Sequence, residues 1–371
     1  MDEGETEEKE IMRKQWLKEI RRIVVKLGTG VLTDERRLPD EDRMRGIVRQ
    51  IAELREAGKE VVVVSSGAVA AGMGVFGWTK RPTDLAELQA CAAVGQSRLM
   101  ATYDRLFSEH GLRVGQMLVT HEDFSDHERH LNARNTLVTL LREGVVPIIN
   151  ENDTVSITEL KFGDNDRLSA LVACLIPADL LVMLTQVDGF LENFGTPEAR
   201  RIPIVEKIDA ALERSAKKTL SPTSVGGMVT KLQAARIATR AGIPAVIACG
   251  TKSDVLRRIV EGEDEGTLFV PSQARLRSRK RWIAFFHYPR GALIVDEGAQ
   301  KALVEGRKSL LLPGIRRCEG EFARGDVVSI CDEEGREFAR GLVRFGKEAI
   351  ERREGIGRGK EIVHRDDLVI L

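Results

Sequence analysis

The sequence predicts an α/β protein: a three-layer αβα sandwich with a mainly parallel sheet, followed by a small β-rich module at the C-terminus. Three observations lead to this prediction. Short runs of β-branched residues recur without polar–apolar alternation, as in strands buried on both faces of a parallel sheet. Patterns with helical periodicity separate these runs. After residue 270 the composition changes to short strands punctuated by glycine and acidic residues.

The alternation of strand and helix extends over residues 21–270. The predicted strands are RIVVKL (22–27), EVVVVSS (60–66), LRVGQMLVT (112–120), VVPIIN (145–150), LLVMLT (180–185) and PAVIACG (244–250). Gly58 ends the clearest helical pattern, one face of which carries Met44, Ile47, Val48, Ile51 and Leu54. Further helices are predicted at about 84–109, 130–143, 165–175 and 228–241. Ligands should bind at the carboxyl ends of such strands.

Two charged stretches flank this region. Residues 1–20 lack periodicity at their start, which indicates a solvated N-terminal extension that runs into a short helix. The basic stretch 271–281 is interpreted as a solvated linker, because no aromatic residue interleaves its charges as in a nucleic-acid clamp. The β-rich module then spans residues 282–371.

Composition and charge exclude several classes of protein. The chain of 371 residues carries 57 basic and 57 acidic residues, so it lacks the net charge that attracts nucleic acid or an anionic membrane. The C-terminal module is equally balanced, with 16 of each. The acidic N-terminus is unlike a signal peptide, and no run of about 18 apolar residues occurs. Five cysteines without C-x-x-C spacing complete the prediction of a cytoplasmic protein.

Three glycine-bearing turns lie where a predicted strand or loop meets a helix: VVKLGTG (24–30), VSSGAVAAG (64–72) and SVGGMVTK (224–231). Their backbone N–H groups can cradle an anion, since no Cβ blocks its approach. Lys26 and Lys231 add two full positive charges. The turns match neither the P-loop nor the Rossmann fingerprint, and any one of them alone could be structural. Their recurrence on successive units favours a phosphate site.

A polar cluster follows the predicted strand at 145–150. Turn and cap roles explain some of its members, Asp164 among them. So many amides and carboxylates after an apolar strand also suit a pocket for a zwitterion, in which Asp153 would take an ammonium group and Asn165 and Ser66 a carboxylate. The cluster comprises Asn150, Asn152, Asp153, Asp164, Asn165 and Asp166.

The segment THEDFSDHERH (120–130) gathers histidines and aspartates without a metal-site spacing. Two of its histidines are three residues apart, but no third ligand is defined. We interpret it as a solvated loop and predict no protein-bound metal. The residues concerned are His121, Asp123, Asp126, His127 and His130.

The ordered motifs of residues 22–371 resemble the glutamate 5-kinases of the amino acid kinase family, which carry a C-terminal PUA domain. The motifs are VVKLGTGVLT, VVVVSSGAVAAGM, AAVGQSRLM, VGQMLVT, LNARNTL, PIINENDTV, GDNDRLSALVA, GGMVTKLQAA and RAGIPAVIACG. The resemblance implies the amino acid kinase fold. It also implies ATP-dependent phosphorylation of the side-chain carboxylate of L-glutamate to L-glutamyl 5-phosphate, the first step of proline biosynthesis.

The resemblance also assigns roles to individual residues. Lys26 and Lys231 would flank the moving phosphoryl group, and Asp166 would orient both lysines. The glutamate would be bound by Ser66, Gly67, Asp153 and Asn165. The nucleotide would be bound by Lys26, Gly28, Thr185, Gln186, Val225, Gly226, Gly227, Met228, Val229, Thr230 and Lys231. The chain departs from the family pattern at three positions. It has Gln186 where the family usually has Asp, Val225 where Thr usually precedes the glycine pair, and Gly30 where Ser is common.

Such a reaction needs ATP and Mg²⁺, the latter held mainly by the nucleotide phosphates. A carboxylate nucleophile is already ionised at neutral pH, so no general base is required. The family further implies a homo-oligomer, a dimer or tetramer, and functional coupling to glutamyl-5-phosphate reductase. Two alternatives stay open: another amino acid kinase, acting on N-acetylglutamate or aspartate, and an RNA-binding protein acting through the PUA domain.

Overall fold

The computed structural model describes residues 3–36, 38–155, 165–217, 227–271, 278–286, 289–353, 355–357 and 359–371. The chain divides into two compact units, Met1–Arg275 and Leu276–Leu371. Each unit has a hydrophobic core of its own.

The first unit is built around an eight-stranded sheet with the order β3-β4-β2-β1-β5-β9-β10-β8. Neighbouring strands are parallel except β9 and β10, which are antiparallel. Six strands coincide with predicted ones, and two short strands were not predicted: β8 at the edge of the sheet and β10 next to it. The strands are β1 (Arg22–Leu27), β2 (Glu60–Ser65), β3 (Val114–Val119), β4 (Val146–Glu151), β5 (Leu180–Thr185), β8 (Ile204–Val205), β9 (Ala245–Cys249) and β10 (Thr267–Phe269).

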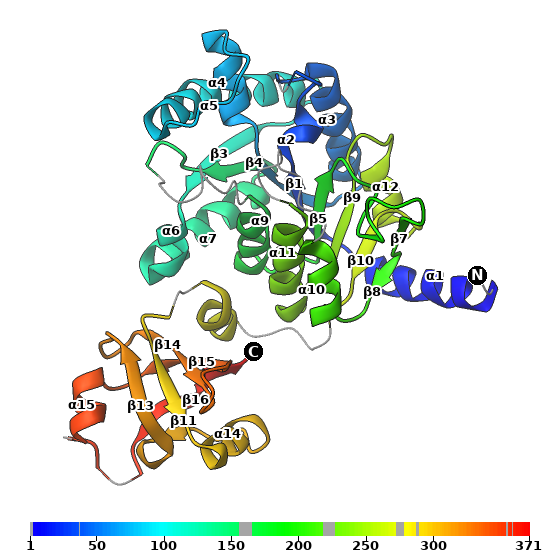
Figure 1. Cartoon of the computed structure of the whole chain (residues 1–371). Helices are drawn as coiled ribbons and strands as arrows, with labels where there is room; N and C mark the ends of the chain where they lie inside the picture. Colours follow the sequence, from blue (N-terminus) through cyan, green and yellow to red (C-terminus); the bar gives the residue numbers. More distant parts are fainter. Residues whose placement is uncertain are drawn as a thin grey trace. The chain divides into compact units, whose positions relative to one another are not determined.

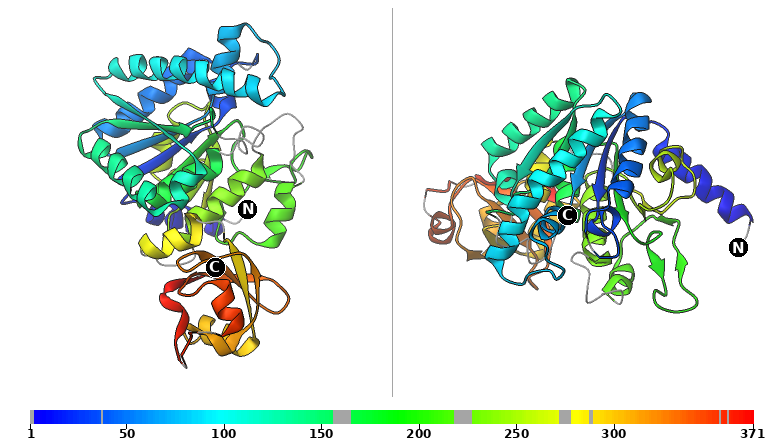
Figure 2. Two further views of the ribbon diagram at one scale, coloured as in Figure 1. Left: turned by 90° about the vertical axis from the view of Figure 1, so that its left-hand side faces the viewer. Right: turned by 90° about the horizontal axis from the view of Figure 1, so that it is seen from above.

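Helices cover both faces of this sheet, which confirms the predicted three-layer sandwich (Figures 1 and 2). One layer holds α3 (Glu41–Glu56), α5 (Leu85–Ser108) and α12 (Val255–Val260). The other holds α7 (His127–Arg142), α9 (Asn165–Leu175) and α11 (Met228–Arg240). The shorter elements are α2 (Thr29–Leu32), α4 (Ala68–Phe76), α6 (His121–Ser125), α10 (Ala210–Lys217), β6 (Leu191–Glu192) and β7 (Arg200–Arg201).

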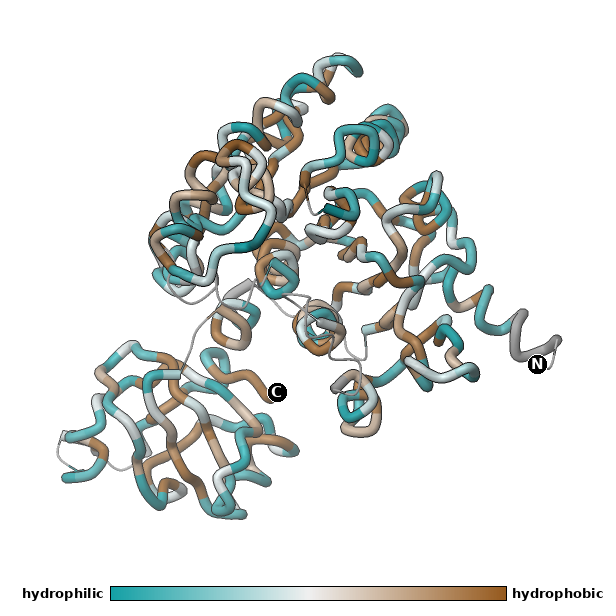
Figure 3. Tube along the Cα trace, turned by 45° about the horizontal axis from the view of Figure 1, so that its top comes forward, coloured by the Kyte–Doolittle hydropathy of each residue, from teal (hydrophilic) through white to brown (hydrophobic). Residues whose placement is uncertain are grey.

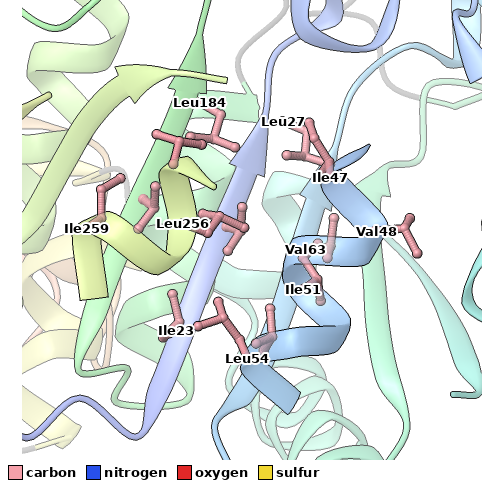
Figure 4. Close-up of a cluster of buried hydrophobic side chains, with 14 of the residues drawn as sticks. Ile23, Leu27, Ile47, Val48, Ile51, Leu54, Val63, Leu184, Leu256 and Ile259 are labelled. Carbon is pink, nitrogen blue, oxygen red and sulfur yellow. The ribbon is translucent and has the colours of Figure 1, made fainter. Parts of the chain in front are cut away.

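Helix α3 shows why the sequence pattern was informative. Asp40 caps its start by accepting a hydrogen bond from the backbone N–H of Arg43, and Gly58 follows its end with a φ of +77°. All five apolar residues of the predicted face are buried. Figure 4 shows Ile51 and Leu54 on the side of α3 that packs with Ile23 of β1. The periodicity therefore identified both the helix and its buried face.

Two glycines allow α4 and α5 to pack at very short range. A Cβ on Gly95 of α5 would lie 1.8 Å from the carbonyl oxygen of Ala68 in α4, and a Cβ on Gly72 of α4 would lie 2.0 Å from the carbonyl oxygen of Cys91. The obstructing atoms are backbone, which cannot swing aside. Because α4 begins directly after Ser66 and Gly67, this packing also places one wall of the candidate site.

Gly95→Ala is expected to destabilise the first unit, because the added methyl group forces α4 and α5 apart. Overpacking of this kind costs about 1–3 kcal/mol, occasionally more. Urea unfolding followed by circular dichroism measures the shift in midpoint. Gly46→Ala in α3 is the matched control, since a Cβ there meets nothing within 4 Å and should stabilise the helix by about 0.5–1 kcal/mol. Equal midpoints for the two variants would contradict the packing argument.

The N-terminal extension was predicted as a solvated tail that runs into a short helix, but the helix is longer than predicted and is anchored by buried residues. Helix α1 (Glu3–Leu17) occupies most of it, and Arg13 and Leu17 are buried. The guanidinium of Arg13 donates to Asp264 at 2.9 Å and to the carbonyl oxygen of Glu265. Burial lowers the pKa of Arg13 to about 10. The charged composition concealed this anchor, because Arg13 pairs with residues some 250 positions away.

The histidine-rich segment is also not a loop. It forms α6 and the start of α7, and its aspartates are capping residues: Asp123 accepts from the backbone N–H of Thr120 at 2.7 Å, and Asp126 accepts from that of Arg129 at 2.9 Å. His130 is buried in α7. Among the side chains that the structure describes, no three His, Cys, Asp or Glu residues are grouped to hold a metal ion. Capping residues and mixed charge, which favoured a loop, serve two short helix starts here.

The second unit is β-rich, as predicted. Its six-stranded sheet has the order β12-β16-β15-β14-β11-β13. Brown hydrophobic segments run through the strands of both units in Figure 3, whereas the exposed part of α1 is teal. The elements are α13 (Ser278–Arg281), η1 (Trp282–Phe286), β11 (Gly291–Val295), α14 (Glu297–Val304), β12 (Leu310–Leu311), η2 (Leu312–Gly314), β13 (Ile315–Gly320), β14 (Val327–Cys331), β15 (Glu337–Val343), α15 (Lys347–Arg352) and β16 (Glu361–Ile370).

The stretch 271–281 is not a solvated connector throughout. Its last four residues form α13, and Arg281 is buried. The π-helical segment η1 continues from α13 and buries Ile283 to Phe286. The backbone of this segment is held by Arg340 of β15, which donates to the carbonyl oxygen of Ala284 at 2.9 Å. The apolar residues that follow the basic run therefore draw its end into the second unit.

Candidate functional site

The candidate site lies where the carboxyl ends of parallel strands meet. Strands β4, β2, β1 and β5 are neighbours in that order, so the segments that follow them share one edge of the sheet. Lys26 lies one residue before the end of β1, and the turn at Gly28 follows it. Ser66 and Gly67 follow β2, Asn150 lies near the end of β4, and Thr185 ends β5.

Asp166 joins two lysines that are far apart in the sequence. Its carboxylate lies in the first turn of α9, with Oδ1 2.8 Å from Nζ of Lys26 and Oδ2 3.1 Å from Nζ of Lys231. The hydroxyl of Thr230 donates to Oδ2 at 2.6 Å. All three charged side chains are at least 93% buried. The fold therefore brings together the three residues for which the sequence suggested a shared role.

The environment of Asp166 keeps this carboxyl ionised. Burial alone would raise its pKa, but the ammonium groups of Lys26 and Lys231, with hydrogen bonds from Lys26 and Thr230, lower the pKa to about 2. Two ammonium groups and one carboxylate leave a formal charge of +1 in a buried place. Such a centre is suited to an anion that approaches from the open side.

Asp166→Asn should destabilise the first unit by about 3–5 kcal/mol, because two buried ammonium groups lose their counter-charge. The folded pKa of Asp166 lies below its ordinary value of 3.8, so its stabilising effect is present above about pH 4 and is lost as the pH falls toward 2. The difference in the free energy of unfolding between wild type and Asp166→Asn should therefore shrink by about 1 kcal/mol when the pH is lowered from 5.5 to 3.

Urea unfolding at these two pH values measures that difference. Asp104→Asn, at an exposed position of α5, is the matched control and should change the midpoint little at either pH. If the difference in the free energy of unfolding between wild type and Asp166→Asn is the same at pH 5.5 and pH 3, the ionised Asp166 carboxylate does not stabilise the fold through its pairs with the two lysines.

A network of side-chain amides lies beside this centre. Nδ2 of Asn165, at the start of α9, lies 2.9 Å from Oγ of Ser66, 3.0 Å from Oδ1 of Asn150 and 3.1 Å from the carbonyl oxygen of Ser65. Asn150 in turn donates to Oε1 of Gln96 in α5 at 2.9 Å. Elements α9, β2, β4 and α5 thus meet through hydrogen bonds, and the predicted pair Ser66 and Asn165 lies in contact.

The sequence analysis missed two members of this network. Asn150 was noted in the polar cluster but assigned no role, and Gln96 was only part of a quoted motif. Both side chains are at least 91% buried. A polar residue that ends a continuous apolar strand, as Asn150 does, was the available signal. For Gln96 there was none, because its partner lies 54 residues away.

The remaining predicted substrate residues lie near the same strand ends. Gly67 has a φ of +106°, which residues other than glycine rarely adopt, and it is the N-cap of α4. Asp153 is half-buried in the turn after β4. Asp164, interpreted as a cap, lies outside the described residues.

The predicted nucleotide residues fall into two groups. Gly28 donates its N–H to the carbonyl oxygen of Leu184 at 3.2 Å, which joins the turn after β1 to the end of β5, where Thr185 is half-buried and Gln186 is exposed. The start of α11 forms the second group: Gly227 caps the helix, and half-buried Met228, Val229 and Thr230 lead to Lys231. Val225 and Gly226 lie outside the described residues.

Comparison with known proteins agrees with this geometry. The model of the amino acid kinase family matches residues 21–249, and that of the PUA domain matches residues 291–365. The chain therefore belongs to the amino acid kinase family. Its relatives of nearly equal length include glutamate 5-kinases of several bacteria.

Three of these relatives illustrate the similarity. The glutamate 5-kinase of Dehalococcoides mccartyi (strain CBDB1) is 45% identical, with 95% of this chain and 98% of the relative covered. The glutamate 5-kinase of Geobacter sulfurreducens is 47% identical and that of Pelobacter propionicus is 43% identical. In both comparisons 97% of this chain and 100% of the relative are covered. No helix of the described residues is both long and apolar enough to cross a membrane.

Proposed function

We propose that this chain transfers the γ-phosphoryl group of ATP to the side-chain carboxylate of L-glutamate, giving L-glutamyl 5-phosphate and ADP, the first step of proline biosynthesis. The observation that carries the proposal is the buried Lys26–Asp166–Lys231 centre at the strand ends, in a chain 45% identical to a glutamate 5-kinase over nearly its full length.

The reaction places few chemical demands on the protein. A carboxylate oxygen of glutamate forms a bond to the γ-phosphorus, and the bond from that phosphorus to the β–γ bridging oxygen breaks, so the electron pair leaves with ADP. The nucleophile is already ionised at neutral pH. Nucleophile and phosphoryl group are both anionic, so the protein must bring them into line and offset their charge.

Lys26 and Lys231 are suited to offset this charge. Their ammonium groups approach Asp166 from two different elements, and an ammonium group carries three N–H donors. In this proposal both lysines contact the moving phosphoryl group. Asp166 is a positioning residue, because its two carboxylate oxygens hold the two ammonium groups together.

The amide network and Asp153 would select the amino acid. Asn165 and Ser66 lie within hydrogen-bond distance of one another and can donate to the α-carboxylate, with the backbone at Gly67 beside them. Asp153 would pair with the free ammonium group, which an N-acetylated substrate lacks. The proposal therefore favours glutamate over N-acetylglutamate.

The turns at Gly28 and Gly227 would hold the nucleotide phosphates, with Thr185, Gln186 and the start of α11 beside them. Mg²⁺ would supply further charge neutralisation between the phosphates. Asp166 is already paired with both lysines, so the metal would be held mainly by the phosphates. A homo-oligomer, coupling to glutamyl-5-phosphate reductase and a cytoplasmic location stay predictions.

Lys231→Met is expected to lower kcat about 10²- to 10³-fold, as the loss of one donor to a transition state does. The release of ADP in the presence of glutamate measures this rate. Lys301→Met, at an exposed position of α14, removes the same charge elsewhere and should leave kcat unchanged. A Lys231→Met enzyme within threefold of wild type would refute the role of this lysine.

Hydroxylamine trapping of the acyl phosphate tests the substrate. The wild-type chain with ATP should yield a hydroxamate from L-glutamate and none from N-acetylglutamate, because the acetyl group removes the charge that Asp153 would pair with. L-Aspartate should also fail, since its carboxylate is one methylene closer to the α-carbon. A hydroxamate from N-acetylglutamate or aspartate but not from glutamate would replace this proposal with another amino acid kinase activity.

A further inference from the structure

Gln186 connects the segments that follow β1 and β5. Its side chain extends from the first position after β5, and Nε2 donates to the carbonyl oxygen of Gly30 at 3.1 Å. Gly30 belongs to α2, which begins directly after the turn at Gly28. The main chains are already joined nearby, where Gly28 donates to Leu184. Gln186 adds a second, side-chain connection farther from the sheet.

The side chain of Gln186 occupies the space that a side chain at Gly30 would need. A Cβ on Gly30 would lie 2.5 Å from Cδ, 2.6 Å from Oε1 and 2.8 Å from Nε2 of Gln186. A Cβ atom does not tolerate nonbonded contacts this short, so one of the two side chains must shift. The glycine and the glutamine therefore depend on one another: any larger residue at position 30 must displace the amide and break its hydrogen bond.

The same segment, including the carbonyl oxygen of Gly30 to which Gln186 donates, is also contacted from α3. Arg43 of α3 lies 3.4 Å from the carbonyl oxygen of Gly30, donates to that of Thr33, and is itself paired with Asp40 at 3.1 Å. Arg43 is partly buried, whereas Gln186 is exposed. Of the two side chains at this carbonyl oxygen, Gln186 thus makes the shorter contact and is the more exposed.

We propose that Gln186 is a positioning residue for the nucleotide: its amide fixes the Gly28–Gly30 turn against the end of β5. The N–H of Gly28 is used by Leu184, so the N–H groups of Thr29 and Gly30 are the ones that would face the phosphates. The inference rests on the proposed function, because it assumes ATP at this turn.

The test measures the affinity for MgATP by isothermal titration calorimetry on the full chain without glutamate. Gln186→Met keeps the length of the side chain but cannot donate, and it should weaken binding about three- to tenfold, as expected for one lost hydrogen bond. The KM for glutamate and the urea midpoint should not change, which separates positioning from general stability. Gln233→Met, at an exposed position of α11, is the matched control.

A double-mutant cycle tests the dependence on Gly30. Gly30→Ala alone should weaken MgATP binding about as much as Gln186→Ala, because the methyl group displaces the amide. The double variant should be no weaker than either single variant. If the losses of MgATP affinity in the two single variants multiply in the double variant, the inference is overturned. A Gln186→Met chain that binds MgATP within 1.5-fold of wild type would overturn it as well. Failure of the wild-type chain to bind MgATP would instead overturn the proposed function and this inference with it.

Discussion

The site depends on one carboxylate that neutralises two buried ammonium groups. Without Asp166, Lys26 and Lys231 would be two buried like charges that repel each other without a counter-charge. With Asp166, both remain charged and close together, and the sum is still positive. The net charge of +1 attracts an anion, while the carboxylate limits the repulsion between the two buried ammonium groups. Phosphoryl transfer between two anions requires both properties.

The fold determines which residues can form such a centre. Lys26 alternates with the apolar residues of β1, so it projects from the face of the sheet opposite the one packed against α3. Helices α9 and α11 lie on that opposite face, and each offers its first turn at the carboxyl ends of the strands. Three residues from three elements therefore meet without any of them being near in sequence. The same edge of the sheet carries the amide network of Asn165, Asn150 and Gln96.

Six strands of the sheet and the buried face of α3 could be predicted from the sequence, because each is marked by a pattern of neighbouring residues. Buried parallel strands read as continuous apolar runs, and the face of α3 was visible in its periodicity. Strands β8 and β10 were missed because they are short and pair at the edge of the sheet. Arg13, Gln96 and the fit of Gln186 to Gly30 were missed for a different reason. Each depends on a partner far along the chain, which no pattern within a window can reveal.

A crystal structure of the chain with ADP, Mg²⁺, glutamate and a planar phosphoryl mimic tests the central claim most directly. The account predicts that Nζ of Lys26 and Nζ of Lys231 both lie within about 3 Å of the mimic's oxygen or fluorine atoms, while Asp166 still contacts both lysines. Either ammonium group directed away from the mimic, with Asp166 holding only the other, would contradict it.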